Sequence, residues 1–173
     1  MATDPLRLRI QMALSDALRE ITVLNGYKHD LSGAEGTAGN KIFRGRAVFG
    51  DGDPLPMISI LEPPLPPDQI PVPDSSGSTA GRWEMVIQGF VQDDKKHPTD
   101  PAQRLVADVL QRLAIEKKRA ATDMRILGFK RIKNLIIGPP VVRPPDDLVS
   151  AKAYFWVNIS IDLAEDLTKP YAD

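Results

Sequence analysis

Few side chains in this sequence could do acid–base chemistry, and its two histidines are the first to consider. His29 and His97 both lie beside residues typical of loops. A Ser-His-Asp site would need one of them held by a carboxylate in a rigid pocket. Asp94 and Asp100 flank His97, but that polar linker is expected to be exposed. We therefore expect both histidines to be solvated, and no catalytic residue is predicted.

Metal and cofactor chemistry is also poorly supported. Asp51 and Asp53 have a spacing that could ligate calcium, but residues 54–56 (Pro-Leu-Pro) add no side-chain oxygen ligands. The chain has no cysteine, which excludes disulfides and zinc sites with sulfur ligands. The glycines spaced through 33–39 are not followed by the Gly-Lys-Ser/Thr of a phosphate-binding loop. We expect a turn at Gly52, a flexible loop at 33–39, and no metal or cofactor.

The strongest electrostatic feature is a cation-rich stretch between residues 117 and 133. Such clusters can bind phosphates whatever the base sequence. Alternatively, the first cations favour a helix C-terminus and the others lie on the solvent face of a strand. The net charge of −1 gives no overall attraction to nucleic acid, so a solvated face or a protein contact is favoured. The residues assigned to this surface are Lys117, Lys118, Arg119, Lys130, Arg131 and Lys133, with Arg125 between them.

Two amphipathic helices are expected to position these side chains. Apolar residues recur at helical spacing from Leu6 to Leu24, with Asp4 as a cap and Gly26 as a stop. A second stripe begins at Asp100, which is expected to cap the helix before a proline at the first helical position. This second helix is expected to reach about Lys118.

The remaining periodic segments predict strands. An Asp-Gly pair between two apolar runs predicts a hairpin. In the last strand Phe155 and its alternate neighbours face one way, while Tyr154 and Trp156 face the other. Gly89 marks a bulge or a close approach of another chain segment. The expected strands are 41–49 and 57–61 (the hairpin), 82–91, 130–137 and 153–163.

These elements predict one α+β domain over residues 1–173, with a mostly antiparallel sheet and two helices packed on one face. Residues 62–81 are expected to form an extended proline-rich loop or arm, and residues 164–173 a C-terminal arm. No run of 18 apolar residues and no secretion signal is present, so we expect a soluble protein without membrane contact.

Tyr154 and Trp156 face away from the side of the sheet that the helices are expected to cover. Aromatic side chains without cover inside the molecule are candidates for an interface, because they bury a large area at low entropic cost. The alternative is that loops of the same domain cover this second face. The sequence does not decide between the two.

The order of elements resembles the tail terminator proteins of long non-contractile-tailed bacteriophages, also described as minor tail or tail-completion proteins. The similarity is in the opening helix 5–24, the strands around 41–61, Trp83–Val91, the proline-capped helix from Asp100, and the closing strand 153–163.

The resemblance implies a structural protein of the virion with no enzymatic turnover. It implies a hexameric ring that caps the tail tube, ends its polymerisation and joins the tail to the neck or head–tail connector. Its partners would be further copies of itself, the tail tube protein and the connector protein, and DNA would pass through the ring without specific binding. The protein would assemble in the host bacterial cytoplasm and reside at the tail–head junction.

One departure from that family is the length of the 62–81 segment. We hypothesise that it is an arm contacting a neighbouring subunit or the tube, through apolar residues that include Leu65, Ile70 and Val72. Two other functions remain open. One is another neck or head–tail connector protein, and the other is a nucleic-acid-binding module that uses the Lys117–Lys133 cluster.

Overall fold

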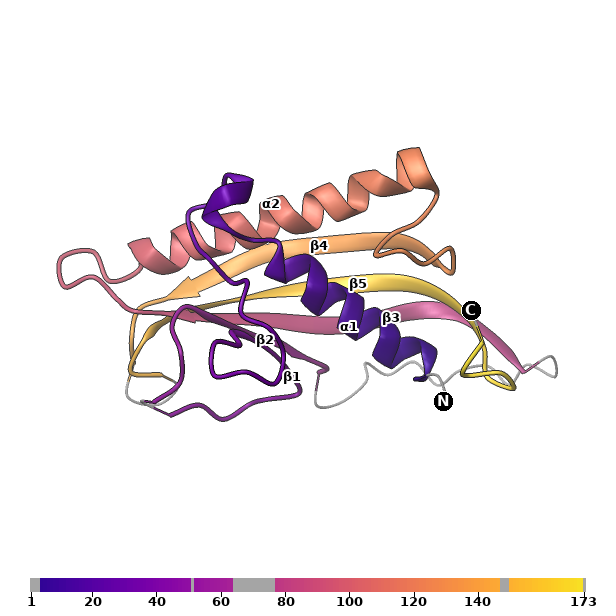
Figure 1. The fold of residues 1–173 in the computed structure, drawn as a ribbon, viewed down its shortest axis with the longest axis horizontal. Coiled ribbons are helices and arrows are strands. Elements are labelled where there is room, and N and C mark those ends of the chain that lie inside the picture. The colour runs from indigo at the N-terminus through magenta and orange to yellow at the C-terminus, as the bar shows by residue number, and fades with distance from the viewer. Residues whose placement is uncertain (1–3, 51, 64–76, 147–149, 173) are drawn as a thin grey trace.

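The computed structural model describes residues 4–50, 52–63, 77–146 and 150–172, with the side chains of 78–80 left aside. Within these ranges helices and strands build one sheet with two α-helices against it, and the C-terminal residues lie near the start of α1 (Figure 1). The helices are α1 (Leu6–Arg19), the 3-10 helix η1 (Val23–Asn25) and α2 (Asp100–Asp123), and the strands are β1 (Ile42–Arg44), β2 (Met57–Leu61), β3 (Ser78–Val91), β4 (Ile132–Arg143) and β5 (Ala153–Asp166).

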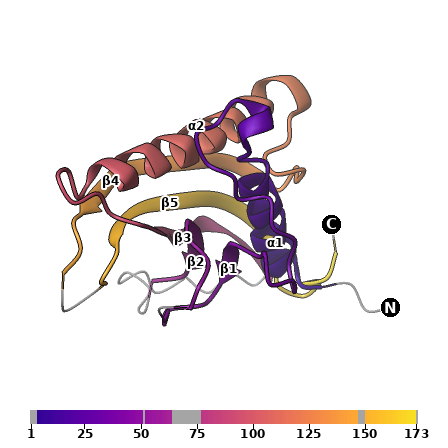
Figure 2. The same ribbon diagram turned by 60° about the vertical axis from the view of Figure 1, so that its left-hand side comes forward.

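The five strands form one sheet in the order β1-β2-β3-β5-β4. Every neighbouring pair is antiparallel except β1 and β2, which run parallel. Both α-helices lie on the same face of this sheet, and the view from the side leaves the opposite face without a helix (Figure 2). The predicted α+β fold, with a mostly antiparallel sheet and two helices on one face, is confirmed.

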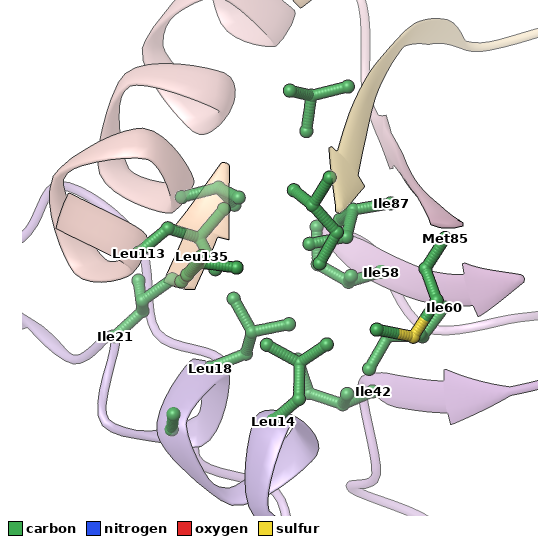
Figure 3. Close-up of a cluster of buried hydrophobic side chains, with 14 of the residues drawn as sticks. Leu14, Leu18, Ile21, Ile42, Ile58, Ile60, Met85, Ile87, Leu113 and Leu135 are labelled. Carbon is green, nitrogen blue, oxygen red and sulfur yellow. The ribbon is translucent and has the colours of Figure 1, made fainter. Parts of the chain in front are cut away.

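The core fills the space between the helices and the sheet (Figure 3). The alternation predicted for the last strand is confirmed, since Phe155 and Val157 are fully buried while Asn158 is exposed. The helices contribute residues at 3.6-residue spacing and the strands alternate residues, as amphipathic elements require. Side chains in this cluster include Leu14, Leu18, Ile21, Ile42, Ile58, Ile60, Met85, Ile87, Leu113 and Leu135.

The predicted hairpin between residues 41 and 61 is wrong. β1 spans only Ile42–Arg44 and pairs with β2 in parallel, so the chain between them must cross over rather than turn tightly. Gly45 leaves β1 with a left-handed φ of 69°, and its N–H donates to the Ile60 carbonyl. Phe49 then packs on Phe90, which draws the connection across the sheet. Long-range aromatic packing therefore prevails over the local Asp-Gly signal.

Both helices differ from prediction at their ends. α1 stops at Arg19, and the Thr22 side chain then accepts a hydrogen bond from the Asn25 N–H to form the turn η1. Leu24, predicted on the buried stripe, is consequently 98% exposed. α1 begins after Pro5 and α2 after Thr99, and neither start is capped by a side-chain hydrogen bond, so the caps assigned to Asp4 and Asp100 are wrong.

α2 and three strands are longer than predicted. α2 continues to Asp123. β3 includes residues 78–81 of the predicted loop, because they pair with residues 163–166 of β5, which were in part assigned to an arm. β4 continues through Gly138-Pro139-Pro140 with a shift of register. Proline is tolerated there because β4 is an edge strand, where a missing N–H leaves no partner unsatisfied.

The C-terminal residues lie against α1. The Pro170 carbonyl accepts the Leu6 N–H at 2.8 Å, and the Ala172 carbonyl accepts the Arg9 guanidinium at 3.0 Å. Residues 164–172 are therefore part strand and part packed turn. No described helix is long and apolar enough to cross a membrane.

Candidate interaction surface

The face of the sheet that the helices leave open carries an aromatic cluster at one end. Phe43, Phe49, Phe90, Tyr154 and Trp156 follow one another with ring centroids 5.0–6.2 Å apart. They come from β1, the 45–56 connection, β3 and β5. Strand pairing places Phe90 opposite Tyr154, and the crossover connection adds Phe49 between Phe43 and Phe90. Contacts at these distances stabilise by about 0.5–1.5 kcal/mol each beyond the area buried.

An ion pair within the 45–56 connection lies against this aromatic cluster. The Arg46 guanidinium lies 4.6 Å from the Phe43 ring centroid and 5.0 Å from that of Phe49. It donates to Asp53 Oδ1 at 2.6 Å, and the Gly50 N–H donates to Oδ2 at 2.7 Å. These two donors, the Gly50 amide foremost, lower the pKa of Asp53 below its ordinary value of 3.8. Asp53 therefore has a structural role in this turn.

The structure separates the two aromatic residues that we assigned to an interface. Tyr154 is buried, with its ring centroid 6.2 Å from that of Phe90, and its hydroxyl donates to Asp146 Oδ2 at 2.7 Å. Burial raises the pKa of the Tyr154 phenol, and the bond to Asp146 raises it further. Trp156 is only half-buried, with Arg143 6.0 Å from its ring centroid. Loops of the chain thus cover Tyr154, while Trp156 keeps part of its surface open.

Beyond Trp156 the open face becomes a band of small polar and aliphatic side chains. Val86 and Gln88 of β3, with Ser160 of β5, are half-buried, and Asn158 is exposed. A sheet face without a covering helix can accept a partner, and its mixed polarity is compatible with this because protein–protein interfaces are on average about as polar as the remaining surface. The candidate interaction surface is therefore Trp156 with this neighbouring band, called the open face below.

The predicted basic cluster divides into residues with different roles. Arg119 pairs with buried Glu116 at 3.0 Å, so part of its charge is used inside the molecule. Lys117 and Lys118 are exposed on α2. The remaining assigned cations lie at the start of β4, where Lys130 and Lys133 are exposed and Arg131 is half-buried.

A buried charge network between α1 and α2 was not predicted from the sequence. Arg112 and Glu116 are 4% and 1% exposed and form an ion pair one helical turn apart. Arg112 also donates to the Ala17 carbonyl at 2.9 Å and to Glu20 at 2.7 Å. The sequence does contain a sign of this network. Arg112 and Glu116 lie seven and eleven residues after Leu105, so helical spacing places both on the apolar stripe of α2.

His29 is also placed differently from prediction. Its Nδ1 lies 2.8 Å from Asp108 Oδ2, and the backbone N–H groups of Lys28 and His29 donate to that same oxygen at 3.0 Å. Asp108 is a buried residue of α2, 79 positions away, so no local pattern could reveal this contact. The pair fastens the loop after α1 to α2. His97 is exposed, as predicted.

Three of the predicted interface residues, Leu65, Ile70 and Val72, lie outside the described residues, as does Asp51. Among the residues that are described, no group of three or more His, Cys, Asp and Glu side chains is arranged to hold a metal ion. No protein-family model matches this chain, and no curated protein matches its sequence.

Proposed function

We propose that this protein is a structural component of the virion of a long, non-contractile-tailed bacteriophage. It forms a ring of identical subunits, six in the family that its sequence resembles. The ring caps the tail tube at the tail–head junction, ends tube polymerisation and presents its other face to the head–tail connector. It assembles in the host bacterial cytoplasm and acts by geometry, without turnover.

The observation that carries this proposal is the one-sided covering of the sheet. α1 and α2 cover one face of the sheet and leave the other without a helix (Figure 2). That other face carries the half-buried Trp156 and the band of side chains beside it. The two edge strands, β1 and β4, have no neighbour on their outer sides within the described chain. A subunit in a cyclic ring needs two different surfaces that fit each other, and an open face and an open edge are surfaces of that kind.

The order of elements supports the same proposal. The opening helix α1, two short strands, the long strand β3, the helix α2 with a proline in its first turn and the closing strand β5 follow the order of elements on which the resemblance rests. The two short strands pair in parallel, not as the hairpin expected there. Another neck or head–tail connector protein would be an assembly protein of the same class, and identification of its neighbours in the virion would distinguish the two.

The mass of the purified protein tests the proposal. We expect sedimentation analysis across protein and salt concentrations to detect a closed assembly of about six times the subunit mass of 19.0 kDa. Addition of purified tail tubes should give a cap at one tube end in electron micrographs. A protein that stays monomeric both alone and in the presence of tubes would contradict the ring.

A further inference from the structure

A tight hairpin connects α2 to β4 and gathers basic side chains around its turn. Ile126 and Phe129 form an isolated antiparallel bridge, and the two residues between them have positive φ, 52° at Leu127 and 83° at Gly128. Positive φ at both central positions is the geometry of a type I′ turn. Ile126 and Leu127 are buried, which anchors the turn to the core. The side chains that flank it therefore project from a fixed base.

Three cations line a groove beside this turn. Arg125, Lys130 and Arg131, together with Gly128 and Phe129, surround a cavity of about 430 Å³. Gly128 contributes no side chain there, so backbone and the Phe129 ring form part of the wall. Like charges gathered on a hairpin repel one another unless an anion lies between them. The groove has the size and the charge of an anion site.

Few carboxylates compensate this charge. Between residues 117 and 133 the sequence holds seven of its 22 basic residues and one of its 23 acidic residues. Asp166 lies near Arg131, whose positive charge contributes to lowering the pKa of that carboxyl, although bonds from Thr168 lower it more. Within the described part of the chain, no carboxylate forms an ion pair with Arg125, Lys130, Lys117 or Lys118.

Further basic side chains lie on the two elements that the hairpin joins. Lys118 lies five residues before the end of α2, which is about 8 Å along the helix axis. Lys133 lies on β4. Phosphates follow one another at about 3.4 Å along the axis of each DNA strand, so basic side chains on both elements can contact several of them. A single carboxylate ligand would use only the groove.

We propose that the groove of Arg125, Lys130 and Arg131 binds backbone phosphates of duplex DNA, with Lys117, Lys118 and Lys133 as flanking contacts. Guanidinium groups match phosphate oxygens with paired donors, and the ammonium groups add charge without directional demands. Because the proposed contacts are to phosphates, the binding is expected to be independent of base sequence. The inference goes beyond a ring through which DNA passes without specific binding, because it assigns a phosphate contact to named side chains, and it does not depend on ring formation.

Fluorescence anisotropy with a labelled 20-base-pair duplex of arbitrary sequence tests the proposal. At protein concentrations where the chain is monomeric, we expect log K to fall linearly with log salt between 50 and 200 mM. Three to five phosphate contacts give a slope of about −3 to −4.5. The double substitution Arg125→Gln and Lys130→Gln should reduce the slope by about 2 and weaken binding at 50 mM salt by at least about tenfold.

A matched control removes two cations at the other end of α2. Lys95→Gln with Lys96→Gln changes the net charge equally at an exposed linker, separated from the hairpin by 24 helical residues, or about 36 Å. It should leave the slope within about 0.5 of the wild-type value. The unfolding midpoint of each variant, read by circular dichroism, should equal that of the wild type because all four side chains are at the surface.

Three results would overturn the proposal. The first is no binding of the duplex by the wild type at 50 mM salt. The second is equal loss of affinity in the groove variant and the control, which would indicate diffuse charge attraction. The third is displacement of the duplex by a poly-glutamate peptide at a lower charge concentration than by unlabelled DNA, which would assign the groove to an acidic protein partner.

Discussion

At the scale of single residues, a glycine of β3 leaves space for the largest side chain in the fully buried core. Gly89 pairs with Phe155 across β3 and β5, and a Cβ built on Gly89 would lie 2.0 Å from the Phe155 ring. Phe155 is fully buried and cannot move aside without disturbing its neighbours. The close approach predicted at Gly89 from the sequence is therefore confirmed, with Phe155 as the partner.

Gly89→Ala should lower the free energy of unfolding by about 1–3 kcal/mol, because the added methyl overpacks the core. Gly81→Ala is the matched control, since it lies in the same strand with no heavy atom within 4 Å of the added Cβ. Urea unfolding followed by tryptophan fluorescence measures both. Equal stability of the two variants would mean that Phe155 does not occupy this space.

A second residue-scale prediction concerns the buried charge pair in α2. Arg112→Met leaves the Glu116 carboxylate buried without its main partner, which should cost about 3–5 kcal/mol of unfolding free energy. Adding Glu116→Leu should recover most of that loss, because the isolated buried charge is then gone. The Arg112 bond to the Ala17 carbonyl stays lost. A double variant no more stable than Arg112→Met would contradict this account.

At the scale of elements, the 45–56 connection depends on one carboxylate. The pKa of Asp53 is lowered, so its folded value lies below its unfolded value near 3.8. A group with a lowered folded pKa stabilises the folded state above the unfolded pKa, and that contribution disappears as the pH falls through the folded pKa. The stabilisation from the hydrogen bonds that Asp53 accepts from Gly50 and Arg46 should therefore be complete at neutral pH. It should be lost progressively below about pH 4.

Asp53→Asn tests this at neutral pH. We expect faster hydrogen exchange of the Gly50 amide and weaker exclusion of solvent from Phe49, since the variant cannot pair with Arg46 as a charge. In the wild type the same amide should exchange faster, after correction for intrinsic rate, only below about pH 4. Unchanged protection in Asp53→Asn would show that aromatic packing alone holds the connection.

The elements with a sustained period were predictable, and those set by distant contacts were not. The alternation along β5 and the stripe of α2 placed the correct faces toward the core. The predicted hairpin between residues 41 and 61 was wrong because Phe49 packs on Phe90, 41 positions later, and no local pattern encodes that contact. The predicted end of α1 near Leu24 was wrong because the Thr22 side chain accepts a hydrogen bond from the Asn25 N–H and forms a separate turn.

For the candidate surfaces too, local sequence features were predictable and features set by distant contacts were not. Exposure of Lys117 and Lys130 was predictable from composition and from their places on solvent faces. The separation of Tyr154 from Trp156 was not, because it depends on contacts of Tyr154 with Phe90 and Asp146 in other segments of the chain. Likewise, the groove at Arg125 requires a type I′ turn whose first central residue is Leu127, a residue that does not signal positive φ.

At the scale of the whole molecule, the two layers separate the functions we propose. Helices and sheet enclose one core, and the α2–β4 connection lies with the helices, while the other face of the sheet carries no helix (Figures 1 and 2). The basic side chains proposed to contact DNA lie on and beside that connection. Subunit contact through the open face would leave the hairpin uncovered. A ring could therefore contact DNA and hold its neighbours with different parts of each subunit.

The last prediction tests the open face as the subunit contact. Trp156→Glu places a carboxylate beside Gln88 and Val141, the strand partners of residue 156. Burying that charge in the interface would cost several kcal/mol. We expect the closed assembly to dissociate to monomers that still bind DNA. Gln111→Glu adds the same charge on the exposed face of α2, in the other layer, and should assemble as the wild type does. Sedimentation of both variants decides the point, after circular dichroism has shown that both are folded. Intact assembly of Trp156→Glu would move the subunit contact from the open face to the edge strands β1 and β4, where strand pairing would hold the ring instead.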